Sequence, residues 1–219
     1  MRAVSLAQFI SLIALLSFDG CSSAPLSDEH VVTHHDDPQR LQPLRRALTH
    51  SPAQDQALAT EGARYPIYRL RSKYRGEETI GVRYFQEEQR IPHRGYACEG
   101  LLCDAQGVRL DPQLGLPKHA HRNGKAIFVI DPQGKFWLTF DHRYGRVHHS
   151  SLVAGEPVIA AGEMLLEDGH LLSISNESGH YHPGPESVDV AFTILRLMGV
   201  KVSQVERYVV ESKPKLPLP

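Results

Sequence analysis

The sequence lacks several features on which particular protein classes depend. Its charges nearly cancel, with a formal net charge of -1, which removes a global electrostatic case for binding nucleic acid or membrane surfaces. It has no internal repeat and no Gly-x-Ser-x-Gly elbow, so a conventional serine hydrolase is not favoured. Its three cysteines do not form the paired Cys or His pattern of a usual zinc site. Partners must therefore be inferred from local features.

The first segment predicts export. The apolar run Leu6–Phe18 follows Arg2 and is too short to span a bilayer, but it suits the hydrophobic stretch of a secretory signal. Gly20 before Cys21 resembles a bacterial lipoprotein processing site, in which Cys21 would be acylated, although Asp19 fits that pattern poorly. A secreted form cleaved nearby and an uncleaved signal of another type are the alternatives. The expected location is the cell envelope or the exterior, with membrane contact only through a lipid anchor.

The remaining chain is long enough for one domain of ordinary size with one core. We expect a signal peptide at 1–21, a flexible polar linker at 22–57 with at most a short helix near 41–48, a domain at 58–212 and a loose tail at 213–219. If Cys21 is lipidated, Cys98 and Cys103 remain as an even pair that an oxidising compartment would allow to form a disulfide. Two unpaired structural cysteines are the alternative.

The domain is predicted to be of the α+β class, with a mostly antiparallel β-meander sheet and one or two packed helices. The best-marked strands flank the turn Asp131–Gly134, and the helix after Pro185 has apolar residues at helical spacing before Gly199. The predicted strands are 65–75, 79–85, 126–130, 135–140, 146–152, 157–167, 170–175 and 205–210. The first of these alternates apolar with basic residues, including Arg69, Arg71, Lys73 and Arg75.

Two clusters place chemically useful side chains at predicted strand edges. One contains His148, His149, Ser150 and Ser151, and the other contains Ser178, Gly179, His180, Tyr181 and His182. At strand spacing, His180 and His182 would share a face and could form a three-imidazole metal site with His148 or His149, but no acidic or cysteine ligand completes it, and we assign no metal. The alternative is that these groups satisfy buried backbone at strand ends.

Five short motifs occur in the same order as in the C-terminal domain of the plant IQM proteins, and the chain resembles a bacterial relative of them. The motifs are Arg64–Tyr68, Ala126–Ile130, His149–Gly155, Ala160–Gly162 and Ser178–Pro183. The family is named for an IQ calmodulin-binding motif that lies outside the shared domain and has no counterpart here, so calmodulin is not supported as a partner. The plant proteins generally have a basic residue in place of Glu163, which makes a catalytic role for Glu163 doubtful.

Two functional hypotheses follow. The first is an effector with ADP-ribosyltransferase-like activity, which would use NAD and need a basic group, a serine-containing strand and a late glutamate; Arg64 or Arg69, then Ser150 and Ser151, then Glu186 or Glu206 occur in that order. The second is a non-catalytic cell-envelope lipoprotein domain that binds a small ligand or protein. The predicted catalytic centre is His149, Ser150, Ser151, His180 and Tyr181. The test of the binding hypothesis is whether His149, Ser150, His180 and Tyr181 converge on one concave pocket.

Overall fold

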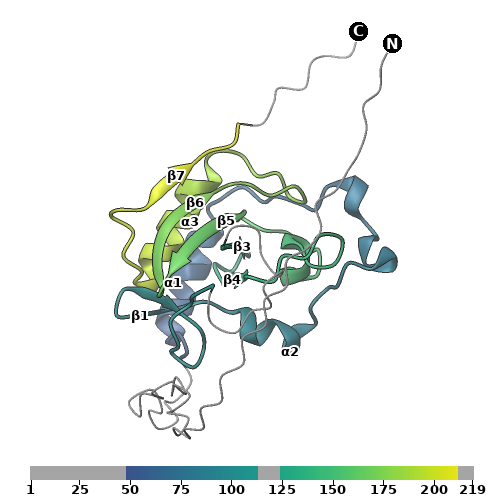
Figure 1. The fold of residues 1–219 in the computed structure, drawn as a ribbon. Coiled ribbons are helices and arrows are strands. Elements are labelled where there is room, and N and C mark those ends of the chain that lie inside the picture. Colours follow the sequence, from purple (N-terminus) through teal and green to yellow (C-terminus); the bar gives the residue numbers. More distant parts are fainter. Residues whose placement is uncertain (1–47, 113–123, 212–219) are drawn as a thin grey trace, which may run out of the picture. The chain divides into compact units, whose positions relative to one another are not determined.

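A computed structural model describes residues 48–112 and 124–211 (Figure 1). The helices are α1 (Pro52–Gly62), α2 (Glu87–Arg90) and α3 (Ser187–Met198), with short 3-10 helices η2 (Ser72–Tyr74), η3 (Glu77–Ile80), η4 (Ile91–His93) and η5 (His149–Val153). The strands are β1 (Tyr96–Cys98), β2 (Leu101–Cys103), β3 (Lys125–Ile130), β4 (Phe136–Thr139), β5 (Ala160–Glu167), β6 (His170–Ser175) and β7 (Glu206–Tyr208). None of the helices in this part of the chain has the length and apolarity to cross a membrane.

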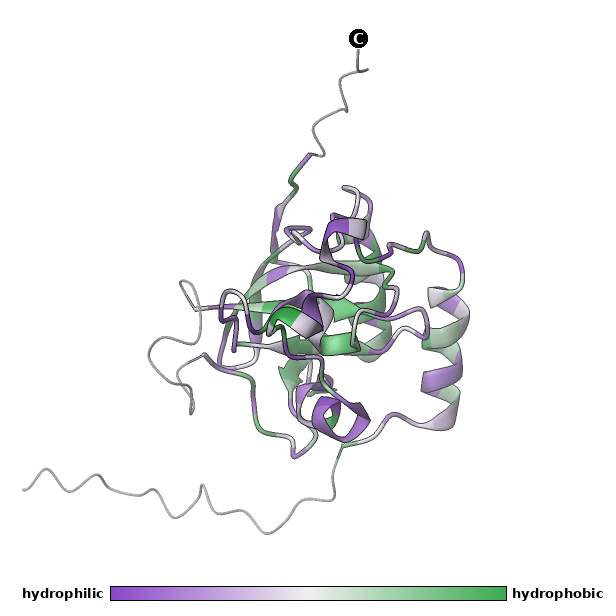
Figure 2. Cartoon of the chain, turned by 90° about the vertical axis from the view of Figure 1, so that its right-hand side faces the viewer, coloured by the Kyte–Doolittle hydropathy of each residue, from purple (hydrophilic) through white to green (hydrophobic). Residues whose placement is uncertain are grey.

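The main sheet has the strand order β4-β3-β5-β6-β7, and only β6 and β7 are parallel (Figure 1). Both faces of its centre are covered. Phe128 and Ile130 of β3 belong to a core shared with α1 and α3, whereas Ile127 and Val129 belong to a second core shared with η5. Burial on both faces explains why β3 reads as a continuous apolar run rather than an alternating one. Figure 2 shows hydrophobic residues gathered on the central strands.

The α+β prediction is confirmed, and so are its best-marked elements. The turn Asp131–Gly134 joins β3 to β4: the Asp131 carboxylate accepts the backbone N–H groups of Gln133 and Lys135, and Gly134 takes a φ of 71°. α3 buries Val188, Phe192, Leu195 and Met198 and ends at Gly199, whose φ of 98° is left-handed.

Three predicted strands are wrong. Residues 65–75 form one isolated bridge, between Tyr68 and Val158, and then η2, because no neighbouring strand pairs with the rest of the segment. Residues 79–85 begin inside η3, which is bounded by left-handed Gly76 and Gly81. Residues 146–152 run into η5. The Ser151 hydroxyl there accepts the His148 backbone N–H, and such local hydrogen bonds of serine compete with sheet formation.

The amino-terminal boundary also differs from the prediction. α1 begins at Pro52, within the segment expected to be linker, because Ser51 caps it by accepting the Gln54 N–H at 3.2 Å. Leu58 of this helix is fully buried in the core. The predicted signal, the lipidation site Cys21, residues 41–47 of the predicted short helix and the whole predicted tail 213–219 lie outside the described residues.

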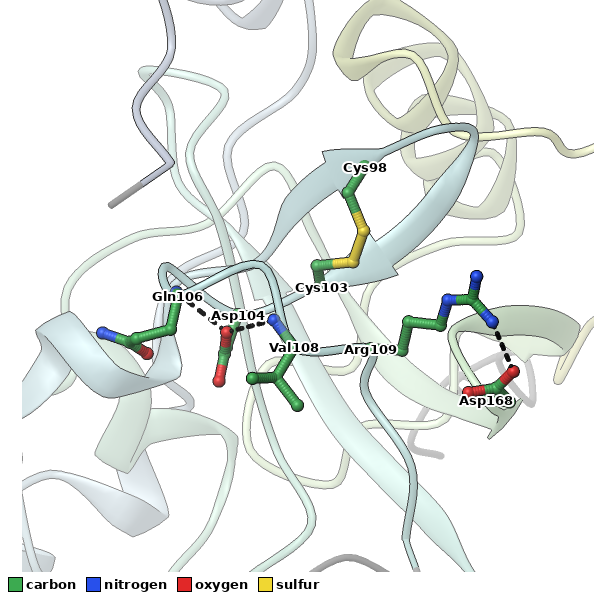
Figure 3. Close-up of a disulfide and its surroundings, with 7 residues drawn as sticks. All are labelled: Cys98, Cys103, Asp104, Gln106, Val108, Arg109 and Asp168. Carbon is green, nitrogen blue, oxygen red and sulfur yellow. Dashed lines mark hydrogen bonds and ion pairs between the residues drawn. A yellow bond between two sulfur atoms is a disulfide. The ribbon is translucent and has the colours of Figure 1, made fainter. Parts of the chain in front are cut away.

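A disulfide joins Cys98 to Cys103 across the hairpin of β1 and β2 (Figure 3). The two turn residues, Glu99 and Gly100, both have positive φ values, of 56° and 90°, as a tight hairpin turn requires. The Asp104 carboxylate beside the hairpin accepts the backbone N–H groups of Gln106 and Val108 at 2.8 and 2.9 Å, which fixes the exit from β2.

Candidate functional site

A cavity of about 670 Å³ lies where four parts of the chain meet: residues 73–82, residues 142–149, Glu163 of β5, and residues 177–180. This volume is in the range of small-molecule sites, roughly 300–1,000 Å³. Its wall is rich in groups that can exchange hydrogen bonds with a ligand. Among them are Tyr74, Glu77, His142, His148, His149 and His180.

The buried carboxylate of Glu77 organises the wall of the cavity. The residue is only 4% exposed, and three side chains from different segments contact its carboxylate. The Ser150 hydroxyl and the Tyr84 hydroxyl donate to Oε1, the latter at 3.3 Å, and His180 Nε2 lies 3.0 Å from Oε2. Burial and the charge of Glu77 raise the pKa of Tyr84, so Tyr84 is a hydroxyl donor at neutral pH.

His180 lies between this carboxylate and two other rings. Its imidazole meets Tyr74 edge to face with ring centroids 4.1 Å apart, and His148 in the same manner at 4.4 Å. Burial, followed by the nearby His142 and Lys73, lowers the pKa of His180 to about 4. The ring is therefore neutral at pH 7, with its Nε2 3.0 Å from Glu77 Oε2.

The two histidines at the start of η5 are held in fixed tautomers. His149 is buried, and its Nε2 lies 2.9 Å from the carbonyl oxygen of Gly162 in β5, so Nε2 carries the proton. His148 Nε2 instead accepts the backbone N–H of Gly145 at 3.0 Å. Burial and the neighbouring imidazoles lower the pKa of His148 to about 4, and burial above all lowers that of His149 to about 3.

The rim of the cavity differs from its floor. Ile80 and Tyr144 line it and are 83% and 97% exposed, and Lys73 and Arg75 add positive charge from one side. The cavity thus offers neutral imidazoles and a carboxylate at depth, and apolar, aromatic and cationic groups at its mouth. Such a gradient suits a ligand with hydroxyl groups at one end and a planar or anionic part at the other.

The five residues predicted as a catalytic centre are near one another but do not all line the cavity. His149 and His180 line it. Ser150 and Ser151 are fully buried behind it: the Ser150 hydroxyl donates to Glu77, and Ser151 Oγ accepts the His148 backbone N–H at 3.0 Å. Tyr181 is also buried, and its hydroxyl donates to the Glu156 carbonyl oxygen at 2.7 Å.

The residues considered for a dinucleotide lie elsewhere. Arg64 is exposed beside Glu61 at the end of α1, and Arg69 is exposed; neither lines the cavity. The two late carboxylates also lie outside it, since Glu186 accepts the Tyr68 hydroxyl and Glu206 accepts the Tyr208 hydroxyl. Glu163 does line it, with its carboxylate 3.2 Å from the Lys125 ammonium.

The three-imidazole arrangement is absent from the described residues. His182 is exposed, has a left-handed φ of 51° and does not line the cavity with His180. Within residues 48–112 and 124–211, no group of three or more His, Cys, Asp or Glu side chains is arranged to hold a metal ion.

Sequence reasoning missed Glu77, Tyr74 and His142. Glu77 is followed by Glu78, which is exposed, and nothing in the local sequence separates the two carboxylates. The available signal is the pair Gly76 and Gly81, whose φ values of 80° and 112° enclose a single tight turn and direct Glu77 inward.

The described residues thus form an α+β domain with a polar, histidine-lined cavity. Residues 107–188 match the family described as the IQ motif-containing protein middle domain. The IQ domain-containing protein IQM3 of Arabidopsis thaliana is 31% identical over 57% of this chain and 26% of its own length. IQM2 and IQM1 of the same plant are 33% and 26% identical, over 37% and 58% of this chain. No solved structure gives a significant match.

The chain is thus similar to the plant IQM proteins over part of its length, a relationship that its five motifs predict. The matching family describes the shared part as the middle domain, whereas the motifs had been assigned to a C-terminal domain. The chain spans 26% of the length of IQM3 and 24% of that of IQM1, so the similarity covers one part of those proteins.

Proposed function

We propose that this IQM-like domain binds a small, hydroxyl-bearing ligand in the cavity. The observation that carries the proposal is the set of three side-chain contacts on buried Glu77, one of which is with His180 in the wall of a cavity of about 670 Å³. Burying a carboxylate and three neutral imidazoles is unfavourable unless each is well satisfied, and such perturbed groups in a cleft mark functional sites.

Gly179 offers a direct test of the cavity. It lines the cavity, lacks a positive φ, and a Cβ placed on it would come no closer than 3.8 Å to a neighbouring atom, the Tyr74 hydroxyl. Gly179→Leu is expected to fill the site, whereas Gly179→Ala leaves most of it open. A library of small polar compounds would be screened by 1H–15N NMR for shifts of cavity amides.

We expect the hits to move amides in residues 73–80 and 177–180, and to lose at least about tenfold in affinity in Gly179→Leu, which corresponds to about 1.4 kcal/mol. Gly179→Ala is the matched control and should bind within about twofold of wild type. Hits that map to other surfaces, or that bind Gly179→Leu as well as wild type, would contradict the proposal.

A second candidate is ADP-ribosyl transfer from NAD. What favours it is that the cavity combines a tyrosine ring, neutral imidazoles and the carboxylate of Glu177 in one wall. These groups could stack on a nicotinamide, bind ribose hydroxyls and stabilise positive charge developing on the sugar. Arg64, Arg69, Glu186 and Glu206 would have no part in this version, because none of them lines the cavity.

Labelled NAD would test the second candidate. The transferase hypothesis predicts label on a protein acceptor or release of nicotinamide, with at least about a hundredfold loss in Glu177→Gln if that carboxylate stabilises the developing charge. Glu167→Gln, an exposed carboxylate at the far end of β5, is the control. Absence of both binding and turnover would remove this candidate and leave the simple binding function.

We further propose that the chain is exported and anchored through Cys21, on the strength of the apolar run Leu6–Phe18 and the small residue before the cysteine. Incorporation of a labelled fatty acid in a bacterial host would test this. Wild type should be labelled and Cys21→Ser should not; equal labelling of the two would contradict the anchor.

A further inference from the structure

The contact between His180 and Glu77 defines which nitrogen of His180 carries its proton. Nε2 lies 3.0 Å from Glu77 Oε2, and a carboxylate can only accept, so Nε2 is the protonated nitrogen of the neutral ring. Both side chains are buried, with 8% and 4% of their surface exposed. The remaining nitrogen, Nδ1, then bears a lone pair.

Nδ1 has no hydrogen-bond partner among the described residues, and the ring forms part of the cavity wall. The carboxylate that orients the ring is itself held, because its other oxygen accepts the hydroxyls of Ser150 and Tyr84. The edge-to-face contacts with Tyr74 and His148 restrict rotation of the ring. These contacts restrict the orientation of a ring whose Nδ1 bears a lone pair and which lines the cavity.

We infer that His180 accepts a proton from a hydroxyl of the bound ligand, and that Glu77 is the positioning residue that holds and polarises it. The ligand O–H bond breaks, its proton passes to Nδ1, and the electron pair remains on the ligand oxygen as a nucleophile. The resulting imidazolium keeps its Nε2–H directed at the Glu77 carboxylate, which stabilises the new positive charge. This inference rests on the proposed binding of a hydroxyl-bearing ligand and adds activation of that hydroxyl.

The groups facing His180 act in opposite directions on its charge. Glu77 of η3 favours the imidazolium, whereas Lys73 of η2 and the imidazoles of His142 and His148 disfavour it, and Tyr74 supplies a neutral ring. Because burial and these neighbours lower the pKa of His180 to about 4, the ring is an unprotonated acceptor across the neutral range.

The tautomer can be measured without any ligand. In full-length protein with 15N-labelled histidine, the ring nitrogens of His180, identified by their loss in His180→Gln, should show a proton on Nε2 and none on Nδ1 at pH 7. Glu77→Gln should mix the two tautomers if it folds, and Glu78→Gln is the matched control. A proton on Nδ1 of wild type, or on both nitrogens, would overturn the inference whatever the variants do.

Reaction with diethyl pyrocarbonate tests whether Nδ1 is accessible as a base. The imidazole lone pair attacks the carbonyl carbon, ethyl carbonate leaves and decomposes to carbon dioxide and ethanol, and the ring keeps the ethoxycarbonyl group after losing its proton. Between pH 7.5 and 5.5, the rate for N-acetylhistidine amide should fall about tenfold, given its pKa of about 6.5. The rate at His180 should fall less than about twofold, because its pKa is about 4.

Modification would be located by peptide mass spectrometry. A tenfold fall at His180, or no reaction there, would overturn the inference. Neither experiment uses a ligand, so failure here leaves the proposed binding open. Failure of the ligand screen, in turn, leaves the tautomer and reactivity results intact.

Discussion

Replacing Glu77 by alanine is expected to destabilise the domain by about 4 kcal/mol. The substitution removes the acceptor of the Ser150 and Tyr84 hydroxyls and the carboxylate beside His180 Nε2. Each buried donor left unsatisfied costs about 1–3 kcal/mol, and several lose their partner together. Urea unfolding followed by the fluorescence of Trp137, the single tryptophan, would measure it.

Glu78→Ala is the matched control, since Glu78 is the exposed neighbour of Glu77 and should lose no more than about 0.5 kcal/mol. Glu77→Gln keeps one acceptor oxygen and should fall between the two. Equal stability of the Glu77 and Glu78 alanine variants would show that the network does not stabilise the fold.

Gly162→Ala is expected to be the second severe variant, with a loss of about 3 kcal/mol or failure to fold. A Cβ at this position of β5 would lie 1.8 Å from the backbone oxygen of Ser175 and 2.8 Å from its carbonyl carbon. The clash is with backbone, so no side-chain rotation relieves it, and forced backbone shifts cost about 1–3 kcal/mol or more. The displaced Gly162 carbonyl would also lose its contact with His149 Nε2.

Gly179→Ala serves as the control for this experiment as well, because its added methyl group meets nothing closer than 3.8 Å. Thermal unfolding would compare the melting temperatures of Gly162→Ala, Gly179→Ala and wild type. A Gly162→Ala melting temperature within about 2 °C of wild type would refute the steric account. The close approach also gives a physical reason for glycine in the Ala160–Gly162 motif.

Local sequence signals were sufficient for the parts of the fold that are stabilised locally. The β3–β4 hairpin is marked by a turn whose proline and glycine occupy suitable positions, and α3 by helical spacing and a terminal glycine. The strand predicted at 65–75 is wrong because alternation of apolar and polar residues indicates that a strand could form, but not that a neighbouring strand exists to pair with it. Likewise, no local signal shows that His148 to Ser151 turn into a helix.

The site was predictable in part for a related reason. His149 and His180 were found because histidine clusters stand out in a sequence, but the residue that organises them, Glu77, resembles an ordinary exposed turn carboxylate. Ser150 was predicted as part of a catalytic centre. The structure does not favour that role, because the buried Ser150 hydroxyl donates to Glu77. Contacts across 73 or more positions of the chain, as between Glu77 and Ser150, leave no local pattern.

The hydrogen bonds on Glu77 determine how the cavity can open. They connect η3, the segment at Tyr84, η5 and the loop of His180, and His149 ties η5 to β5. Segments connected in this way exchange their amide protons as one cooperative unit, since none can leave without breaking the bonds of the others. We therefore expect these segments to share one opening equilibrium, so that a ligand bound in the cavity slows hydrogen exchange in all of them.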